Sequence, residues 1–278
     1  MTRAYLTKPE VVAIADLLNK VTQGDCLEIM RDIPDGSVDL ILCDLPYGTT
    51  ACKWDSVIPF DKLWEQYERV IKQKGAIVLF GSEPFSSALR MSNIELYKYD
   101  WIWEKGRASG FVHAKNKPMK AHENISVFSK GTTVHASQSK RRMEYYPQME
   151  SGAPYKKKIT QVNTGKLNHT PSDANLAFVG TISENEGTRY PRSVLKYSMH
   201  NVGTFHPTQK PVDLCEYLIK TYTNEGEIVL DNCIGSGTTA VAAINTSRNF
   251  IGIEREPEYV DIANKRIDDA LKAKLQEV

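Results

Sequence analysis

Short apolar runs alternate along the chain with segments of helical periodicity. Apolar runs that stop at an acid or a turn are typical of buried parallel strands, and apolar residues spaced three and four apart are typical of helices packed on a sheet. The alternation predicts an α/β protein with a doubly wound, mostly parallel sheet and an antiparallel edge strand. The expected strands are 38–43, 75–80, 228–230 and 250–253, with 101–104 and 124–128 as two antiparallel edge strands, and the expected helices are 9–19, 27–32, 60–72, 84–91, 212–221 and 257–275.

Two of these strands end in segments of different chemistry. The first leads into Asp44-Leu45-Pro46-Tyr47, and the second leads into Asp231-Asn232-Cys233-Ile234-Gly235-Ser236-Gly237. In open α/β sheets, ligands bind beyond the carboxyl ends of the strands, where the strand order reverses. We therefore expect one crevice with a cofactor half at the glycine turn and a reaction half at the acid-Leu-Pro-Tyr segment.

The glycine turn alone also fits a dinucleotide-binding domain. Gly235-x-Gly237-x-x-Ala240 matches the loose fingerprint of such domains, and Glu254 closes the next strand. However, only 24 residues follow Glu254, and they have the pattern of one amphipathic helix. The sheet must therefore be completed by strands from the N-terminal half, with the cofactor motif last in the chain and the acid-Leu-Pro-Tyr motif first.

At these residues the chain resembles a known family. Asp44-Leu45-Pro46-Tyr47 is similar to the D-P-P-Y motif of methyltransferases that modify an exocyclic amino group of a DNA base, and His206-Pro207-Thr208-Gln209-Lys210-Pro211 is similar to the segment before their cofactor turn. The motif order is that of β-class DNA methyltransferases, and the resemblance covers about 20–130 and 203–270. The sequence departs from the family at Leu45, where Pro is usual, and at Asn232-Cys233, where Pro-Phe is usual.

The resemblance implies a Rossmann-like methyltransferase sheet in permuted order and S-adenosyl-L-methionine as the cofactor. Asp231 at a strand end can accept from the cofactor's ammonium group, and Glu254 can hold its ribose hydroxyls. Asp25 resembles the family acid that binds the adenine amino group, and Thr208 and Lys210 match positions near the methionine carboxylate. The full set of expected cofactor-binding residues is Asp25, Cys26, Asp44, Thr208, Lys210, Asp231, Ile234, Gly235, Ser236, Gly237, Thr238 and Glu254.

The expected catalytic residues are Asp44, Leu45, Pro46 and Tyr47. An exocyclic amino nitrogen is a poor nucleophile because its lone pair is delocalised into the ring. Asp44 can accept one amino hydrogen, and the carbonyl of Leu45, as the resemblance implies, can accept the other. Pro46 stiffens the turn through its fixed φ, and Tyr47 offers a stacking face worth about 1–3 kcal/mol to a flipped base.

A concentrated basic segment lies between the motifs. From Lys105 to Lys166 the chain has thirteen basic and three acidic side chains, although the net charge of the whole is only +1. Such a segment is typical of a surface that binds a polyanion, and a solvated loop is the alternative. We expect a methyltransferase domain from 1–131 and 203–278 with an inserted target-recognition region at 132–202, in which Lys140, Arg141, Arg142, Lys156, Lys157 and Lys158 contact DNA.

The leading hypothesis is a site-specific DNA methyltransferase acting on adenine N6, because an acid at the first motif position favours adenine in the resembling family. A cytosine-N4 enzyme and a catalytically silent DNA-binding relative stay open, and an RNA enzyme fits less well. Double-stranded DNA is the expected partner, and a homodimer and a cognate restriction endonuclease are further partners to test. Five cysteines without a C-x-x-C pair, the absence of a long apolar run and no signal pattern indicate a cytoplasmic protein with no metal site and no membrane contact.

Overall fold

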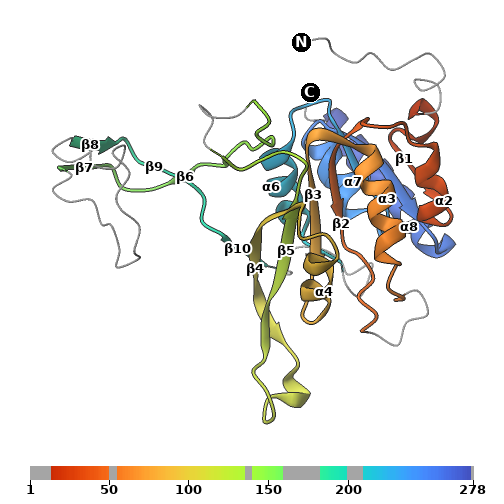
Figure 1. Ribbon diagram of the computed structural model, residues 1–278, viewed down its shortest axis with the longest axis horizontal. Helices are drawn as coiled ribbons and strands as arrows, with labels where there is room; N and C mark the ends of the chain where they lie inside the picture. The colour runs from red at the N-terminus through yellow and green to blue at the C-terminus, as the bar shows by residue number, and fades with distance from the viewer. Residues whose placement is uncertain (1–13, 50–54, 135–139, 159–181, 199–208, 277–278) are drawn as a thin grey trace. The chain divides into compact units, whose positions relative to one another are not determined.

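The computed structural model describes residues 14–49, 55–134, 140–158, 182–198 and 209–276 (Figure 1). They belong to two compact units. The first contains Met1–Tyr146 and Ser193–Val278, and the second contains Pro147–Arg192. The expected insertion, 132–202, is wider than the second unit at both ends.

An eight-stranded sheet forms the centre of the first unit, in the order β1-β12-β11-β2-β3-β5-β4-β10. Its strands are β1 (Lys20–Gln23), β2 (Val38–Cys43), β3 (Ile71–Gly81), β4 (Tyr97–Ser109), β5 (Lys120–Phe128), β10 (Val194–Tyr197), β11 (Ile228–Asp231) and β12 (Asn249–Glu254). The helices are α2 (Cys26–Ile29), η1 (Met30–Asp32), α3 (Phe60–Val70), α4 (Phe85–Ser92), η2 (Phe111–His113), α6 (Val212–Tyr222), α7 (Thr238–Asn245) and α8 (Pro257–Gln276).

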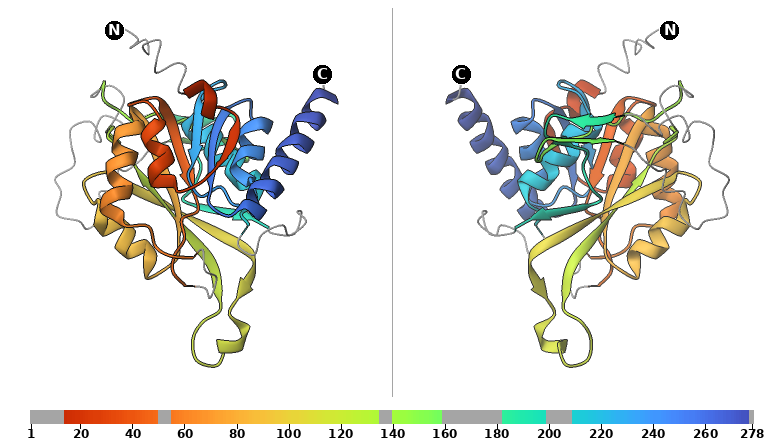
Figure 2. Two further views of the ribbon diagram at one scale, coloured as in Figure 1. Left: turned by 90° about the vertical axis from the view of Figure 1, so that its right-hand side faces the viewer. Right: turned by 90° about the vertical axis from the view of Figure 1, so that its left-hand side faces the viewer.

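Helices cover both faces of this sheet (Figure 2). Leu40 and Leu42 of β2 belong to one apolar cluster, which includes buried residues of α6, α7 and α8. Ile41 and Cys43 point to the opposite face and join a second cluster, which includes buried residues of α3 and α4. Successive side chains of a strand alternate between faces, and β2, which is apolar except for Asp39, is buried on both sides. The doubly wound α/β fold is confirmed.

The antiparallel strand was expected at an edge of the sheet, and this detail is wrong. β5 is antiparallel to both of its neighbours, β3 and β4, and therefore lies inside the sheet. β4 runs parallel to β3, and β10 then pairs with β4 in parallel at the edge. β10 comes from the expected target-recognition region, so part of that region completes the main sheet. Its four residues show no apolar run long enough to predict a strand.

The expected elements otherwise lie close to the observed ones. The strand expected at 38–43 is β2 without change, and the expected helix at 60–72 is α3, which ends at Val70 because β3 begins at the next residue. Of the helix expected at 9–19, residues 14–17 are helical, and residues 9–13 lie outside the described part of the chain.

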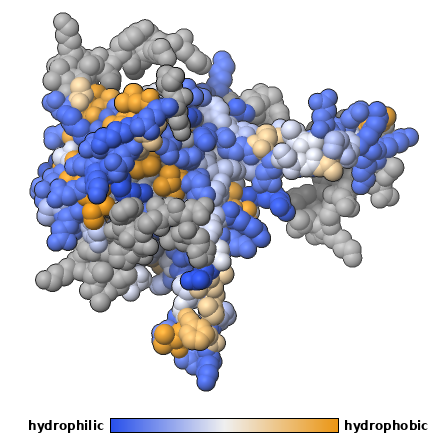
Figure 3. Space-filling view, turned by 180° about the vertical axis from the view of Figure 1, so that it is seen from behind, coloured by the Kyte–Doolittle hydropathy of each residue, from blue (hydrophilic) through white to orange (hydrophobic). Residues whose placement is uncertain are grey.

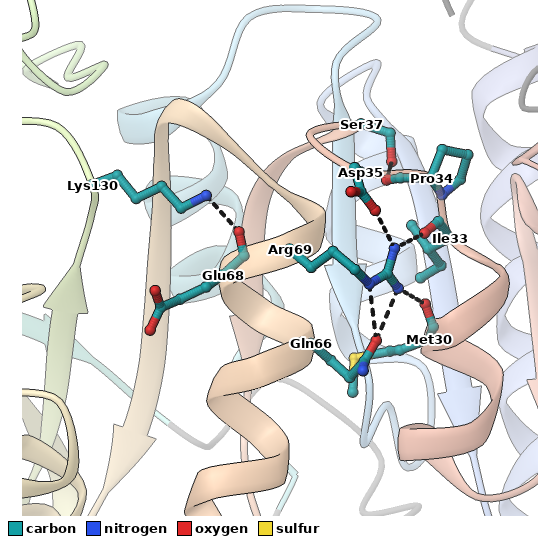
Figure 4. Close-up of polar contacts among 9 residues, drawn as sticks. All are labelled: Met30, Ile33, Pro34, Asp35, Ser37, Gln66, Glu68, Arg69 and Lys130. Atoms are coloured by element: carbon teal, nitrogen blue, oxygen red, sulfur yellow. Dashed lines mark hydrogen bonds and ion pairs between the residues drawn. The ribbon is translucent and has the colours of Figure 1, made fainter. Parts of the chain in front are cut away.

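Arg69 of α3 holds the connection between β1 and β2 in place (Figure 4). Its guanidinium donates to the carbonyl oxygens of Met30 and Ile33, both at 2.6 Å, and to the Asp35 carboxylate at 2.7 Å. The Met30 carbonyl also accepts from the backbone nitrogen of Ile33 at 3.1 Å, so Arg69 adds a second donor there and supplies a donor for the Ile33 carbonyl. The connection thus fixes where β2 enters the sheet.

The second unit is made of two short antiparallel pairs. β6 (Glu150–Ser151) pairs with β9 (Thr188–Arg189), and β7 (Tyr155–Lys158) pairs with β8 (Ile182–Asn185). Among the helices that the structure describes in either unit, none is long and apolar enough to cross a membrane.

Candidate active site

A cavity of about 300 Å³ opens at the carboxyl ends of β11, β12 and β2. This volume is at the lower end of the range for small-molecule sites. The two strand-end segments that the sequence assigned to separate halves both line it. Of the expected site residues, those that line the cavity are Asp25, Cys26, Asp44, Leu45, Pro46, Tyr47, Lys210, Asp231, Ile234, Gly235, Ser236, Thr238 and Glu254.

Two expected cofactor residues are not among the lining residues. Thr208 lies outside the described residues. Gly237 has a φ of 84°, and a Cβ at this position would lie 3.0 Å from the Cα of Ala263 on α8. Gly237 therefore permits the close approach of α8 to the turn, which is a packing role. Gly235 has a φ of 53° and does line the cavity, so the conformation of its backbone shapes the site.

Carboxylates hold the backbone of the cofactor half. The Glu254 carboxylate accepts from the backbone nitrogens of Gly235 and Glu256, both at 2.9 Å. Asp25 is the N-cap of α2, and its Oδ1 accepts from the backbone nitrogen of Leu27 at 2.8 Å. Asp231 is buried, and burial raises its pKa to about 6 against a hydrogen bond from Thr239. These three acids give the cavity hydrogen-bond acceptors and negative charge.

Asp44 follows β2 directly and reaches the reaction half of the cavity. Its Oδ1 accepts a hydrogen bond from the Tyr47 hydroxyl at 2.6 Å. The Tyr47 ring lies against Phe85, with 4.9 Å between ring centroids and 31° between the planes. Leu45, which departs from the family motif, is 4% exposed and belongs to the apolar cluster around α3. The Leu45 side chain therefore packs in the core. A proline ring at this position would reach less far into the cluster.

Lys210 connects Asp44 to an acid that the sequence did not single out. The Lys210 ammonium contacts Asp44 Oδ2 and lies 3.5 Å from Glu123 Oε2. Glu123 also contacts Lys105. Burial raises the pKa of Asp44, and the Lys210 ammonium opposes that rise. Desolvation alone would lower the pKa of Lys210, but the two carboxylates outweigh it and raise the pKa.

The Glu123 carboxylate responds in the opposite direction to Asp44. Burial would raise its pKa, but Lys210 and Lys105 hold the pKa below its ordinary value. The network therefore favours the ionised form of Glu123. For Asp44, burial favours the protonated form, and the Lys210 ammonium favours the ionised form. Lys210 was expected beside the cofactor carboxylate. The structure places its ammonium on Asp44, still within the lining of the cavity.

Three further residues support the site, and the sequence did not single them out: Asp55, Arg266 and Tyr67. The Asp55 carboxylate accepts from the backbone nitrogens of Gly48 and Thr49, both at 2.8 Å, and so holds the loop after Tyr47. Arg266 of α8 donates to the Ser236 carbonyl at 2.6 Å. The departure at Asn232 is explained by a buried hydrogen bond of 2.6 Å from the Tyr67 hydroxyl to its Oδ1. An acid soon after a Gly-Thr turn is a weak signal for Asp55, but the helical pattern of α8 gives none for Arg266.

The expected DNA-binding clusters lie in different units. Lys140, Arg141 and Arg142 are exposed and belong to the first unit. Lys156, Lys157 and Lys158 are exposed on β7 of the second unit, and Lys156 forms an ion pair of 3.0 Å with Glu184. Part of the positive charge in the second cluster is therefore balanced within its own unit.

A protein-family model described as DNA methylase, for N6 and N4 methyltransferases, matches residues 38–265. The chain belongs to this N6/N4 DNA methylase family. It is therefore a DNA amino-methyltransferase, and the resemblance in the sequence motifs is confirmed. The match spans β2 to α8 and so contains both strand-end segments that line the cavity.

Curated relatives and solved structures are similar over most of this methyltransferase. Type II methyltransferase M.HinfI of Haemophilus influenzae is 27% identical over 91% of this chain and 69% of its own length, and M1.MboII of Moraxella bovis is 28% identical over 89% and 95%. The M1.HpyAVI–SAM complex has a TM-score of 0.58 at 24% identity, covering 90% of this chain and 98% of its own. The cytosine-N4-specific PvuII DNA methyltransferase has a TM-score of 0.61 at 18% identity, covering 91% and 90%. These structures share the fold.

Proposed function

We propose that this chain transfers a methyl group from S-adenosyl-L-methionine to the N6 nitrogen of an adenine that has left the DNA duplex. The observation that carries the proposal is that Asp44, at the end of β2, lines the same cavity as the glycine turn Asp231–Gly235. One cavity can then hold a methyl donor against the turn and an amino group against the acid. The target must be extruded, since its amino group is otherwise paired and stacked.

The lining residues fit the proposed cofactor. S-adenosyl-L-methionine supplies an electrophilic methyl group when bound. Its ammonium and ribose hydroxyls need acceptors, and Asp231, Glu254 and Asp25 provide carboxylates along one side of the cavity. Because Asp231 and Glu254 are buried, their remaining lone pairs need donors, and a cationic ligand with hydroxyl groups would supply them. The structure of the M1.HpyAVI neighbour is that of its complex with SAM, which supports the same choice.

The acidic residue at the first motif position supports adenine. Asp44, when ionised, accepts an amino hydrogen of the target, and a carbonyl at the turn accepts the other, which localises the lone pair on nitrogen. The Lys210 ammonium favours this ionised form. Tyr47 donates to Asp44 and so fixes the orientation of the carboxylate, and its ring offers a stacking face to the base.

A cytosine-N4 enzyme is the second candidate. The cytosine-N4-specific PvuII enzyme has the same fold, so the fold does not separate the two bases. In the family that the sequence resembles, a serine at the first motif position accompanies cytosine, and this chain has Asp44. The names of the Type II relatives support a place in a restriction-modification system, with double-stranded DNA as substrate. A homodimer and a cognate endonuclease stay predictions.

The test is transfer of a labelled methyl group to unmethylated plasmid DNA, followed by nucleoside analysis. We expect N6-methyladenine from the wild-type protein and no product from Asp44→Ala, because the turn carbonyl alone cannot orient the amino group. Asp269→Ala removes an exposed acid in the middle of α8 and is the matched control, with unchanged turnover expected. N4-methylcytosine as product would select the second candidate, and near-normal turnover by Asp44→Ala would overturn the role of the acid.

A further inference from the structure

β4 and β5 continue beyond the sheet as a two-stranded arm, residues 105–122 (Figure 2). β4 runs parallel to β3 and β2, so it leaves the sheet at the edge where β2 delivers Asp44. Between the pair Trp103–Glu123 and the pair Ser109–Lys120, β5 advances by three residues, or about 10 Å, and the extra residues of β4 form an irregularity in the pairing. The 3₁₀ turn η2 (Phe111–His113) lies at the far end. The arm therefore projects from the catalytic edge, and residues 110–119 continue it beyond the last strand pair.

The base of the arm is joined to the catalytic acid. Lys105 on β4 contacts Glu123 on β5, and Glu123 lies 3.5 Å from the Lys210 ammonium that contacts Asp44. Lys120 contacts the Ser82 hydroxyl after β3. These contacts fix the root of the arm relative to the reaction half of the cavity.

The arm is basic and has exposed apolar side chains at its end. Residues 105–122 contain five lysines and arginines, two histidines and no acidic residue. Arg107, Lys115 and Lys117 are exposed. Phe111 is 79% exposed and Val112 is 88% exposed, and apolar surface lies next to hydrophilic surface near the end of the arm in the space-filling view (Figure 3). Adjacent exposed apolar side chains with a polar rim are typical of a surface that binds a partner.

We propose that this arm binds the DNA duplex beside the target base, with Phe111 and Val112 wedged against the base stack and the exposed lysines that follow them, Lys115 and Lys117, on the phosphates. The inference rests on the proposed function, because it assumes a duplex at the catalytic edge. Positive charge without any acid matches a polyanion, and apolar wedges are used by proteins that unstack DNA. Extruding a base leaves a gap between two apolar base faces, and an aromatic side chain can fill it.

The test compares Phe111→Ala/Val112→Ala with Leu275→Ala, which removes an apolar side chain of equal exposure (79%) from the end of α8. Both variants should fold, because neither alters a buried side chain. Turnover on plasmid DNA should fall about tenfold or more in the double variant and stay unchanged in the control. The salt dependence of binding to a labelled plasmid fragment should not change in the double variant, since the wedge carries no charge.

A second variant, Lys115→Gln/Lys117→Gln, should weaken binding to the same fragment and make its salt dependence shallower by up to about 1.8, or 0.9 for each phosphate that is no longer neutralised. Normal turnover by the double apolar variant, or an unaltered salt slope in the lysine variant, would overturn the proposal.

A change of oligomeric state of the double apolar variant in sedimentation, with unchanged DNA binding, would also overturn it, because the end of the arm would then be a contact between two copies of the chain. If the wild-type protein methylates no DNA while the lysine variant still shows the shallower slope, the methyltransferase proposal fails and the arm's contact with DNA stands.

Discussion

Replacing Lys210 by methionine removes an ammonium group that a half-buried carboxylate, Asp44, and a buried one, Glu123, share. The Lys210 side chain is 7% exposed, and it lies between the side chains of Asp44, 24% exposed, and Glu123, 11% exposed. Methionine has nearly the same length, so the change deletes charge with little loss of packing volume. Asp44 keeps the hydrogen bond from Tyr47 but loses its cation.

The expected destabilisation is about 3 kcal/mol at pH 8. Removing one partner of a buried ion pair typically costs about 3–5 kcal/mol, because the other charge is left without compensation. The lower end applies, since Glu123 keeps Lys105 and Asp44 is partly exposed. At a urea m-value of about 3 kcal/mol/M, the midpoint of unfolding should fall by about 1 M.

The pH dependence of this loss has a defined sign. Without Lys210, burial holds the pKa of Asp44 further above its value in the unfolded chain, so ionisation in the folded state costs free energy at pH 8. As the pH falls through that raised pKa, Asp44 takes up a proton in the folded state, and the difference between variant and wild type should shrink. In the wild type, the lowered pKa of Glu123 contributes stability above about pH 4.5 that is lost on further acidification.

Urea unfolding at pH 8 and pH 5.5 measures both effects. Lys196→Met is the matched control, because it breaks the exposed pair between Lys196 and Glu104, which is 3.1 Å long and worth about 0–1 kcal/mol. Combining Lys210→Met with Glu123→Gln should cost less than the sum of the single changes, since the network loses charge on both sides. A midpoint for Lys210→Met no lower than that of Lys196→Met would refute the reasoning.

Three further predictions concern ligand binding. Gly235→Val, at a φ of 53°, should abolish S-adenosyl-L-methionine binding in calorimetry. The control Gly226→Val, at a φ of 78° with open space around its Cβ, should have similar backbone strain and bind the cofactor normally. Equal losses of binding in the two variants would contradict a role of Gly235 in the cavity. Because the pKa of Asp231 is about 6, cofactor affinity should fall about tenfold per pH unit below pH 6, and a flat profile from pH 5 to 8 would exclude Asp231 as the ammonium acceptor. Lys157→Gln/Lys158→Gln should make the salt dependence of DNA binding shallower by up to about 1.8 without changing cofactor affinity, and an unchanged slope would make β7 a solvated strand.

The sequence was sufficient to predict the elements that carry the two half-sites. A run such as Val38–Cys43 is buried on both faces, so its apolar pattern indicates a strand without any knowledge of its neighbours. Asp44 and Asp231 then meet in one cavity because carboxyl ends of parallel strands share one edge of the sheet. Such local patterns also placed α3, α6 and α8.

Contacts set by strand order could not be predicted in the same way. Glu123 reaches Lys210 only because β5 is inserted between β3 and β4, and nothing in the local pattern of β5 fixes its neighbours. β10 could not be predicted for the same reason, because only its pairing with β4 makes these residues a strand. The motif assigned Gly237 to the cofactor. In the structure, the absence of a Cβ at Gly237 permits the close approach of α8, and the position of α8 cannot be read from the motif.

The pairing of β2 with β11 has a consequence for the newly made chain. Leu40 lies opposite Val229, so the edge of β2 that faces β11 has no partner until the ribosome has made the C-terminal part of the protein. At about 5–20 residues per second, that interval is roughly 10–40 s. During it, a strand that is apolar except for Asp39 offers unpaired backbone groups to any other extended chain. Because of the permuted motif order, the centre of the sheet can form only after the C-terminal part of the chain has been made. We therefore expect truncated N-terminal products to aggregate.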